Sequence, residues 1–268
     1  MSAPIAAPLA PPKPRPGLAG LVALGLIALA GIGLVYYLVE VWNPELIARY
    51  GPLYLKGLGT TISLVLTSFV FGALLSLPIA FGRTARNPLA RGLAFVFVYF
   101  FRGTPLIAQI FLVYYGFGQF RGFFEGIGLW WFFRDAWYCA AFSLSLNTAA
   151  YQAEILRGAV ASVPRGQWEG GRALGLSRGV IFRKVILPQA MIVALRPYAN
   201  EIILMVKASA IVAIITVYDL LGETRRAYSR TFDFQTYIWA AVLYLMIVEA
   251  LRHLTDFAER RLTRHLKR

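Results

Sequence analysis

The 268-residue sequence has few charged residues: 15% are Asp, Glu, Lys or Arg, against about a quarter in an ordinary soluble domain. Hydrophobic residues make up 58% of the chain, which excludes disorder as its dominant state, since disordered chains need low hydrophobicity. One cysteine, Cys139, excludes an internal disulfide and a multi-cysteine metal site. With only His253 and His265 available, a histidine-built metal site is not expected either. The sequence predicts no metal and no cofactor.

The sequence also lacks the Gly-Lys dipeptide of a Walker-type phosphate loop, so no nucleotide site of that kind is expected. Residues 175–179 match the pattern Gly-x-Ser-x-Gly around Ser177. That motif works at a strand-to-helix turn with a histidine base, whereas here it lies in a basic loop that favours helix. A membrane-embedded hydrolase using Ser177 is therefore a remote alternative. We expect no catalytic residue and no enzyme.

Long hydrophobic blocks are what the sequence has in abundance. The bilayer core is about 30 Å thick, so a spanning helix needs about 20 mostly apolar residues. Six blocks of this kind cover about residues 18–39, 57–82, 92–120, 137–156, 185–206 and 235–251. Arg102 interrupts the third block, Arg196 and Glu201 interrupt the fifth, and Glu249 lies near the end of the sixth. They predict an all-α membrane protein with about six transmembrane helices.

The basic residues lie between these blocks, so the formal net charge of +14 indicates a membrane partner and not a nucleic acid. With the N-terminus in the cytoplasm, the inside segments carry roughly twice as many Lys and Arg residues as the outside ones. This bias predicts that both termini are cytoplasmic. The Pro-rich residues 1–17 would form a cytoplasmic tail. We interpret residues 18–39 as an anchor helix because the apolar region of a secretory signal is shorter, about 7–15 residues.

The loop between the fourth and fifth blocks has the signals of a helical hairpin. Pro164 suits a helix start, Gly175 suits a left-handed cap at its end, and Ser177 suits the start of the next helix. Trp168 and Arg172 would share one face of the first helix, and these residue types dominate protein interface hot spots. An ordinary connecting loop is the alternative.

This loop also resembles a known family. The pattern Glu169-Gly170-Gly171, three residues, Gly175, nine residues, Val185-Ile186-Leu187-Pro188 resembles the EAA loop of ABC importer permeases. This sequence departs from the family pattern in two ways: Gly170 and Gly171 replace its two alanines, and Val185 replaces its isoleucine. Three further segments are similar to the polar amino-acid branch, especially histidine, lysine/arginine and opine permeases: Phe101-Arg102-Gly103-Thr104-Pro105-Leu106, Leu146-Asn147-Thr148-Ala149-Ala150-Tyr151 with Glu154, and Tyr198-Ala199-Asn200-Glu201-Ile202-Ile203-Leu204-Met205.

The resemblance implies a permease core over residues 51–255, with a coupling loop at about 158–184, in a bacterial inner membrane. It implies two cytoplasmic ABC ATPase subunits, a second permease that is the same or a homologous chain, and a periplasmic amino-acid-binding protein. The substrate would be a polar, preferentially basic, amino acid or an opine, with glutamine-like substrates open. The residues expected to form the ATPase-coupling loop are Arg165, Trp168, Glu169, Gly170, Gly171, Arg172 and Gly175.

Polar side chains inside a membrane span are costly unless they are paired or line a cavity. Ser143, Asn147, Tyr151 and Glu154 recur on one helical face. We expect Asn147, Tyr151 and Glu154 to line the substrate pathway together with Asn200 and Glu201, and Glu154 to attract an ammonium or guanidinium group. The alternative pairs Glu154 with Arg157, and Arg196 with Glu201.

The third block contains Arg102-Gly103-Thr104-Pro105, where the missing N–H of proline predicts a bend. This bend is a candidate gate, and the alternative is an arginine that reaches the membrane surface beside a carboxylate. A secondary transporter or channel driven by an ion gradient is the rival function, although the sequence has no internal repeat of the kind such transporters usually have. Residues 256–268 form a basic tail, expected to lie in the cytoplasm against anionic lipid headgroups.

Overall fold

The computed structural model describes residues 17–40 and 43–263. These fall into two compact units, one ending at Ile47 and the other beginning at Ala48. The first unit contains α1 (Leu18–Glu40), which has no buried residue and is long and apolar enough to cross a membrane. It corresponds to the expected first span. The expected tail lies almost entirely outside the described residues.

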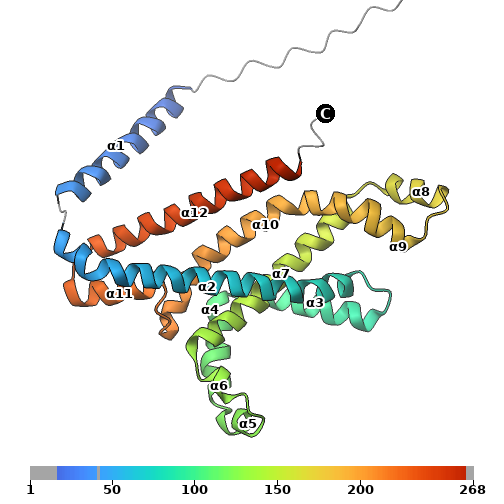
Figure 1. The fold of residues 1–268 in the computed structure, drawn as a ribbon, viewed down its shortest axis with the longest axis horizontal. Coiled ribbons are helices and arrows are strands. Elements are labelled where there is room, and N and C mark those ends of the chain that lie inside the picture. Colours follow the sequence, from blue (N-terminus) through green and yellow to red (C-terminus); the bar gives the residue numbers. More distant parts are fainter. Residues whose placement is uncertain (1–16, 41–42, 264–268) are drawn as a thin grey trace, which may run out of the picture. The chain divides into compact units, whose positions relative to one another are not determined.

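The second unit is helical throughout its described part, as the predicted all-α class requires (Figure 1). Helix α2 begins at Pro44, before the unit does, and continues well into it. The elements in chain order are α2 (Pro44–Arg83), α3 (Pro88–Gly103), α4 (Leu106–Phe111), the π-helical turn η1 (Leu112–Gly116), α5 (Arg121–Gly126), α6 (Trp130–Phe133), α7 (Ala136–Ser162), α8 (Arg165–Ala173), α9 (Arg178–Ile181), the π-helical turn η2 (Phe182–Ile186), α10 (Leu187–Ser209), the 3₁₀ helix η3 (Ala210–Ile215), α11 (Leu220–Thr231) and α12 (Gln235–Leu262).

Among the described residues, four segments are long and apolar enough to span a membrane: α1, α2, the continuous stretch Arg178–Ile215 and α12. A fifth forms if α3 and the α4–η1 segment together count as one bent span. The fourth predicted block corresponds to α7, which has 27 residues but is not among these apolar helices. Helix α12 continues past the predicted block to Leu262, so part of the expected C-terminal tail is helical. Residues 264–268 lie outside the described part.

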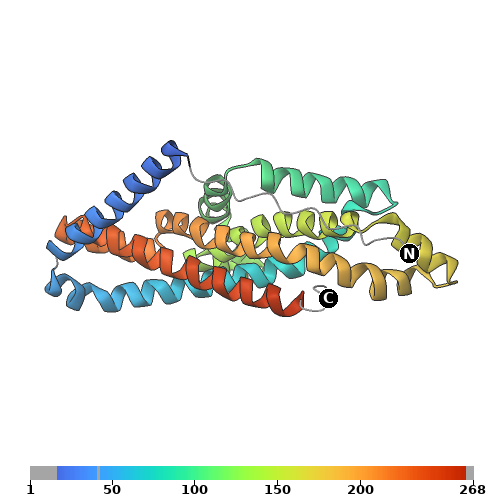
Figure 2. The same cartoon turned by 90° about the horizontal axis from the view of Figure 1, so that it is seen from above.

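Helix α7 lies among the other helices and not on their outside. It packs along α10 and against α3 and α4, while α10 also packs along α12 (Figures 1 and 2). Its buried residues include polar ones such as Ser145, Thr148 and Gln152. The Ser145 hydroxyl donates to the Ala141 carbonyl within α7, but Thr148 and Gln152 donate to Glu201 and to the Phe69 carbonyl of other helices, and they would lose these partners if they faced lipid, at a considerable free-energy cost. The composition that makes α7 a poor lipid-facing helix therefore accounts for its central position.

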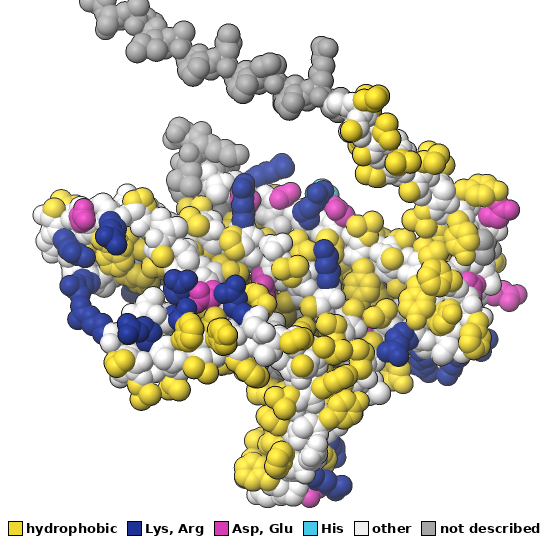
Figure 3. Space-filling model, turned by 180° about the vertical axis from the view of Figure 1, so that it is seen from behind, with side chains coloured by type: hydrophobic (Ala, Val, Ile, Leu, Met, Phe, Trp, Pro, Cys, Tyr) yellow, Lys and Arg dark blue, Asp and Glu magenta, His cyan; other side chains and the backbone are white. Residues whose placement is uncertain are grey.

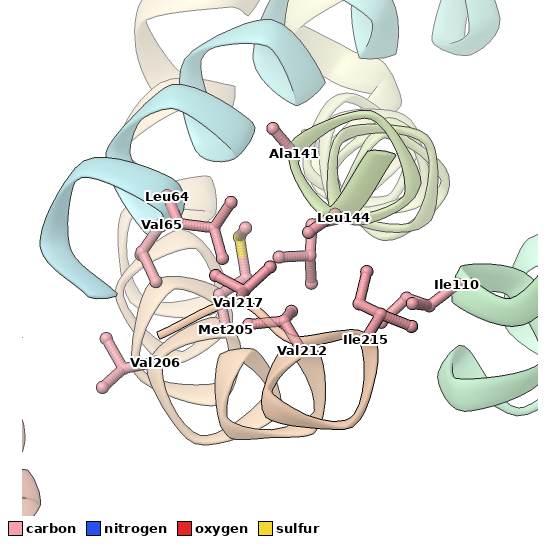
Figure 4. Close-up of a cluster of buried hydrophobic side chains, with 11 residues drawn as sticks. Leu64, Val65, Ile110, Ala141, Leu144, Met205, Val206, Val212, Ile215 and Val217 are labelled. Atoms are coloured by element: carbon pink, nitrogen blue, oxygen red, sulfur yellow. The ribbon is translucent and has the colours of Figure 1, made fainter. Parts of the chain in front are cut away.

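A cluster of buried apolar side chains joins these helices on one side of α7 (Figure 4). It draws on α2, α4, α7, α10, η3 and the residue Val217: Leu64, Val65, Ile110, Ala140, Ala141, Leu144, Met205, Val206, Val212, Ile215 and Val217. Lipid chains are as apolar as these side chains, so close packing must hold the helices together within a membrane. Gly57 and Gly72 of α2 allow such packing. An added Cβ would lie 2.8 Å from the Asp219 carbonyl oxygen at Gly57 and would collide with Thr148 at Gly72.

The third predicted block is not a single span but two helices bent by 108° relative to each other. Helix α3 begins at Pro88, where the side chain of Asn87 accepts a hydrogen bond from the Leu89 N–H at 2.9 Å. It ends at Gly103, two residues before Pro105. Proline lacks an N–H and favours extended backbone in the residue before it, and Thr104 does have extended backbone, so the helix ends here, whereas α2 continues through Pro52 and Pro78. The predicted bend is therefore present.

At the end of the unit opposite α8, Asp219 fixes the start of α11 (Figure 1). Its carboxylate accepts hydrogen bonds from the Gly222 N–H at 2.8 Å and from the Tyr244 hydroxyl of α12 at 3.2 Å. The Leu220 N–H next to it donates to the Thr61 hydroxyl of α2 at 3.1 Å. Asp219 is fully buried, and this burial raises the pKa of its carboxyl to about 6, despite the hydrogen bonds that lower it.

We expect Asp219→Asn to weaken the pH dependence of stability. The folded state holds the Asp219 proton more strongly than the unfolded chain, so this group's stabilising contribution is complete below about pH 4 and is lost as the pH rises through about 6. Between about pH 5 and pH 7.5 the free energy of unfolding of the wild type should fall by on the order of 1 kcal/mol more than that of the variant. Thermal unfolding in detergent at several pH values measures this. Asp256→Asn, at an exposed position, is the control, and equal pH profiles for Asp219→Asn and wild type would contradict the assignment.

Candidate functional site

A cavity of about 440 Å³, mostly apolar but with several polar side chains in its wall, lies where the α3–α4 bend meets α7 and α10. Its lining residues are Thr104, Leu106, Leu144, Asn147, Tyr151, Glu201, Leu204, Met205, Lys207 and Ala208. Three of the five residues expected along a substrate pathway, Asn147, Tyr151 and Glu201, therefore meet at one cavity. Glu154 and Asn200 are not among its lining residues, and Asn200 is exposed on α10.

Glu201 is the carboxylate of this cavity and is only 7% exposed. Its Oε1 accepts a hydrogen bond from the Thr148 hydroxyl of α7 at 2.9 Å. Thr148 in turn accepts from the Gln152 amide at 3.1 Å, and that amide also donates to the Phe69 carbonyl oxygen of α2 at 3.2 Å. A buried polar chain thus connects α2, α7 and α10. Thr148 and Gln152 are not among the residues predicted along the pathway, although their i, i+4 spacing within a span is a usable signal.

The alternative pairing of Arg196 with Glu201 is wrong. Arg196 forms an ion pair with Glu259 of α12 at 2.7 Å, and its side chain is 81% exposed. Arg196 and Glu201 are five positions apart, which places them on different faces of a helix with 3.6 residues per turn. Glu201 is consequently directed toward α7 while Arg196 is directed outward.

Glu154 is held by two arginines at the end of α7. It forms ion pairs with Arg83 of α2 at 2.8 Å and with Arg157 at 2.7 Å. The expected alternative pairing with Arg157 is therefore present, and Arg83 is an additional partner that the sequence analysis missed. Glu154 lies at a separate cavity of about 300 Å³, which Arg102 and Gly103 also line.

The guanidinium carbon of Arg102 lies over the ring of Tyr151, 5.1 Å from the ring centroid. This contact brings the residue before the bend next to a residue of the larger cavity. Arginine over an aromatic face is a favourable cation–π arrangement, worth about 0.5–1 kcal/mol at exposed sites and more when desolvated. The two cavities are thus adjacent through Arg102 and Tyr151.

The predicted helical hairpin is present at the other functional region of the chain. Helix α8 begins directly after Pro164, and Gly175 has the left-handed φ of +73° at its end. The Gly175 N–H donates to the Arg172 carbonyl at 2.9 Å and the Leu176 N–H to the Gly171 carbonyl at 3.1 Å, the pair of bonds of a Schellman cap. Ser177 is the N-cap residue directly before α9, but its side chain makes no capping hydrogen bond.

The hairpin forms an electropositive groove of about 870 Å³. Its lining residues are Arg86, Arg165, Trp168, Glu169, Arg172, Arg178, Gly179 and Phe182. Arg86 comes from the loop between α2 and α3, so two separate segments contribute to this groove. Figure 3 shows Lys and Arg side chains gathered at the end of the second unit that carries α8 and α9. Trp168 stacks on Phe182, with ring centroids 6.4 Å apart, and is thereby fixed against η2.

The two consecutive glycines of α8 differ in their surroundings. Gly171 is buried, and an added Cβ would lie 2.8 Å from the Ile181 side chain of α9. Nothing lies within 4 Å of the corresponding position at Gly170. Close packing within the hairpin therefore explains the absence of a side chain at Gly171, while Gly170 faces open space.

Residues 68–268 match the protein family described as the binding-protein-dependent transport system inner membrane component. This chain belongs to that family. As an importer permease it is a transport subunit embedded in a membrane, and its helical fold agrees with this membership.

Several permeases of this family are similar to the chain. It is 38% identical over 224 residues to the nopaline transport system permease protein NocM of Agrobacterium fabrum, covering 83% of this chain and 93% of that protein. It is 38% identical over 200 residues to the arginine ABC transporter permease protein ArtM of Haemophilus influenzae, covering 74% and 87%. A crystal structure of an amino acid ABC transporter with histidines has a chain with 32% identity and a TM-score of 0.72, covering 80% of this permease and 96% of that chain.

We expect Gly171→Ala to loosen the hairpin of this permease and Gly170→Ala to tighten it. The added methyl at Gly171 must displace Ile181, which costs about 1–3 kcal/mol when the surroundings are well packed. At Gly170 alanine gains about 1 kcal/mol of helix propensity without a collision. Hydrogen exchange of the α8 amides should become faster in Gly171→Ala and slower in Gly170→Ala. Slower exchange in Gly171→Ala would rule out the close contact with α9.

Proposed function

We propose that this permease carries basic amino acids or opines through the cavity between α4, α7 and α10, driven by ATP hydrolysis on partner subunits. The observation that carries the proposal is the set of polar residues around the cavity. Asn147, Tyr151 and Glu201 lie within helices that must be shielded from lipid, and such residues generally mark substrate pathways. The named relatives that transport nopaline and arginine support a cationic substrate.

Glu201 is the group that favours a positive charge in the cavity. The Thr148 hydroxyl donates a hydrogen bond to its buried carboxylate, and a substrate ammonium or guanidinium would add further donors. Lys207, on the same cavity, suits the substrate carboxylate. Glu154 remains a candidate for attracting cations, acting beside Arg83 and Arg157. Asn200 remains a candidate that would need to turn toward the pathway.

The residues around the bend, Arg102, Gly103, Thr104 and Pro105, are proposed to gate the cavity. They join α3 and α4 at an angle, and small changes at such a junction move the two helices relative to each other. Arg102 would follow this movement through its contact with Tyr151.

The groove on α8 is proposed to bind a cytoplasmic ATPase subunit. Its lining from α8 consists of Arg165, Trp168, Glu169 and Arg172. Gly171 allows α8 to pack closely on α9, and Gly175 ends α8 with a left-handed backbone. Four arginines and one glutamate make the groove cationic, so the docking surface of the ATPase should be acidic. Two such subunits, each binding one copy of the permease or of a homologous chain, would drive alternating access.

The proposed location is the bacterial inner membrane with α8 and both termini on the cytoplasmic side. The basic residues of the α2–α3 loop and of α8 lie together, in agreement with the bias expected for cytoplasmic loops. A periplasmic amino-acid-binding protein would then dock at the end of the permease that carries α11. An ion-gradient carrier is the rival function, and it would need neither this protein nor the ATPase.

Reconstitution tests the proposal. We expect ATP-dependent uptake of labelled arginine when the permease is placed in liposomes with its ATPase and binding protein. Glu201→Gln should raise the KM for arginine about tenfold, the equivalent of one lost favourable interaction of about 1.4 kcal/mol, and should change the KM for glutamine less. Glu249→Gln, at an exposed carboxylate of α12, is the matched control and should leave both KM values unchanged.

Uptake by the permease alone, without ATP hydrolysis, would favour the ion-gradient carrier and contradict the proposal. If uptake is ATP-dependent but Glu201→Gln transports arginine like the wild type, the importer function stands and the assignment of Glu201 to the cavity chemistry is wrong. The uptake of labelled histidine, measured alongside, defines how far the permease discriminates among cationic and polar substrates.

A further inference from the structure

The bend between α3 and α4 leaves a backbone carbonyl without its usual partner. In a continuous α-helix the Phe101 carbonyl would accept a hydrogen bond from the N–H of residue 105, four positions later. Residue 105 is proline and has no N–H. Within a membrane no water replaces the missing donor, so another group of the protein must supply it.

Gln109 supplies that donor. Its side chain comes from the next turn of α4, and the residue is 4% exposed. The Nε2 group donates to the Phe101 carbonyl at 3.0 Å and to the Thr104 hydroxyl and carbonyl at 2.8 and 3.2 Å. One buried amide, with two N–H groups shared among these acceptors, therefore bonds to backbone on both sides of Gly103.

The same amide also determines the orientation of Asn147. The Gln109 Oε1 accepts a hydrogen bond from the Asn147 Nδ2 at 2.9 Å, and that Nδ2 also donates to the Phe101 carbonyl at 3.1 Å. Both N–H groups of Asn147 are thus directed to the bend. The amide oxygen is then the atom that Asn147 has available for a molecule in the cavity, which it lines.

An oxygen and an amino group at this position recognise opposite partners. The oxygen accepts hydrogen bonds from ammonium or guanidinium groups, whereas the amino group would donate to carboxylates. Exchanging the oxygen and the nitrogen of the Asn147 amide would direct its oxygen at the Gln109 Oε1 and the Phe101 carbonyl oxygen. All three oxygens are acceptors, and none of them carries a proton to donate. The contacts with Gln109 therefore exclude the exchanged orientation.

We propose that Gln109 is a positioning residue for substrate selection: it holds Asn147 with the amide oxygen available to a cationic substrate while it stabilises the α3–α4 bend. The inference rests on the proposed function of the cavity. Gln109 is not among the residues that line this cavity, so it acts on the substrate only through Asn147. Its effect must accordingly disappear when the Asn147 amide is removed.

A double-mutant cycle tests this dependence. Gln109→Leu removes both the donor and the acceptor and should raise the KM for arginine about tenfold, while the loss of its hydrogen bonds to the proposed gating bend should lower kcat. Asn147→Ala should raise the KM by a similar factor. Because both substitutions break one interaction, the KM of the double variant should be no higher than that of Asn147→Ala alone. Gln189→Leu is the matched control, since the Gln189 amide donates to the Val185 carbonyl within α10 at 2.9 Å, and its KM should equal that of the wild type.

A second variant separates positioning from folding. Gln109→Glu keeps an oxygen that accepts from the Asn147 amide but places its second oxygen against the Phe101 and Thr104 carbonyls. Its KM for arginine should therefore be closer to the wild-type value than that of Gln109→Leu, while its thermal stability should be lower than that of the wild type. Thermal unfolding of each variant in detergent identifies the variants that fold. If Gln109→Leu does not fold, the cycle is run with Gln109→Glu: this variant is compared with the double variant that carries Gln109→Glu and Asn147→Ala.

Two outcomes would overturn the inference. One is an unchanged KM in the folded Gln109 variants, and the other is full additivity of the Gln109 and Asn147 effects. Both require that the wild type transports arginine with ATP, so they are distinct from failure of the proposed function, in which the wild type itself shows no such uptake.

Discussion

The need to shield the polar helix α7 from lipid determines how the second unit is built. Its buried polar residues could not face hydrocarbon without partners, so α10 covers α7 along its length and α3 and α4 cover other parts of it. Hydrogen bonds join α7 to Glu201 of α10 and to Gln109 of α4. In a membrane, where apolar contacts gain little from excluding water, these polar contacts specify which helices are neighbours.

The same arrangement relates the cavity to the coupling region. Helix α7 carries Asn147 and Tyr151 at the cavity and Glu154 near its end, where Arg83 and Arg157 hold the carboxylate. The chain then passes within a few residues into α8 and its cationic groove. One helix therefore carries polar groups of the cavity at its middle, and only two residues separate its end from the start of the cationic hairpin, so a movement of the hairpin would have a short path to the cavity.

Sequence patterns predicted the helical class, most spans, the bend at Pro105 and the hairpin with its left-handed Gly175, because each depends on local chemistry. Partners distant in sequence could not be predicted in this way. The pairing of Arg196 with Glu259 and that of Arg83 with Glu154 depend on which helices pack together. Gln109 was missed for the same reason: its role depends on a carbonyl eight residues earlier and on an amide of another helix.

Substituted-cysteine accessibility in liposomes tests most directly whether the polar face of α7 lines the route of the substrate. In a Cys139→Ala background, Tyr151→Cys places a thiol at the cavity, and Ala153→Cys places one at a fully buried position of the same helix. A water-soluble thiol reagent should modify Tyr151→Cys, arginine should slow that reaction, and Ala153→Cys should not react. Equal reactivity at both positions, or a Tyr151→Cys that stays unmodified during ATP-driven uptake, would contradict the account.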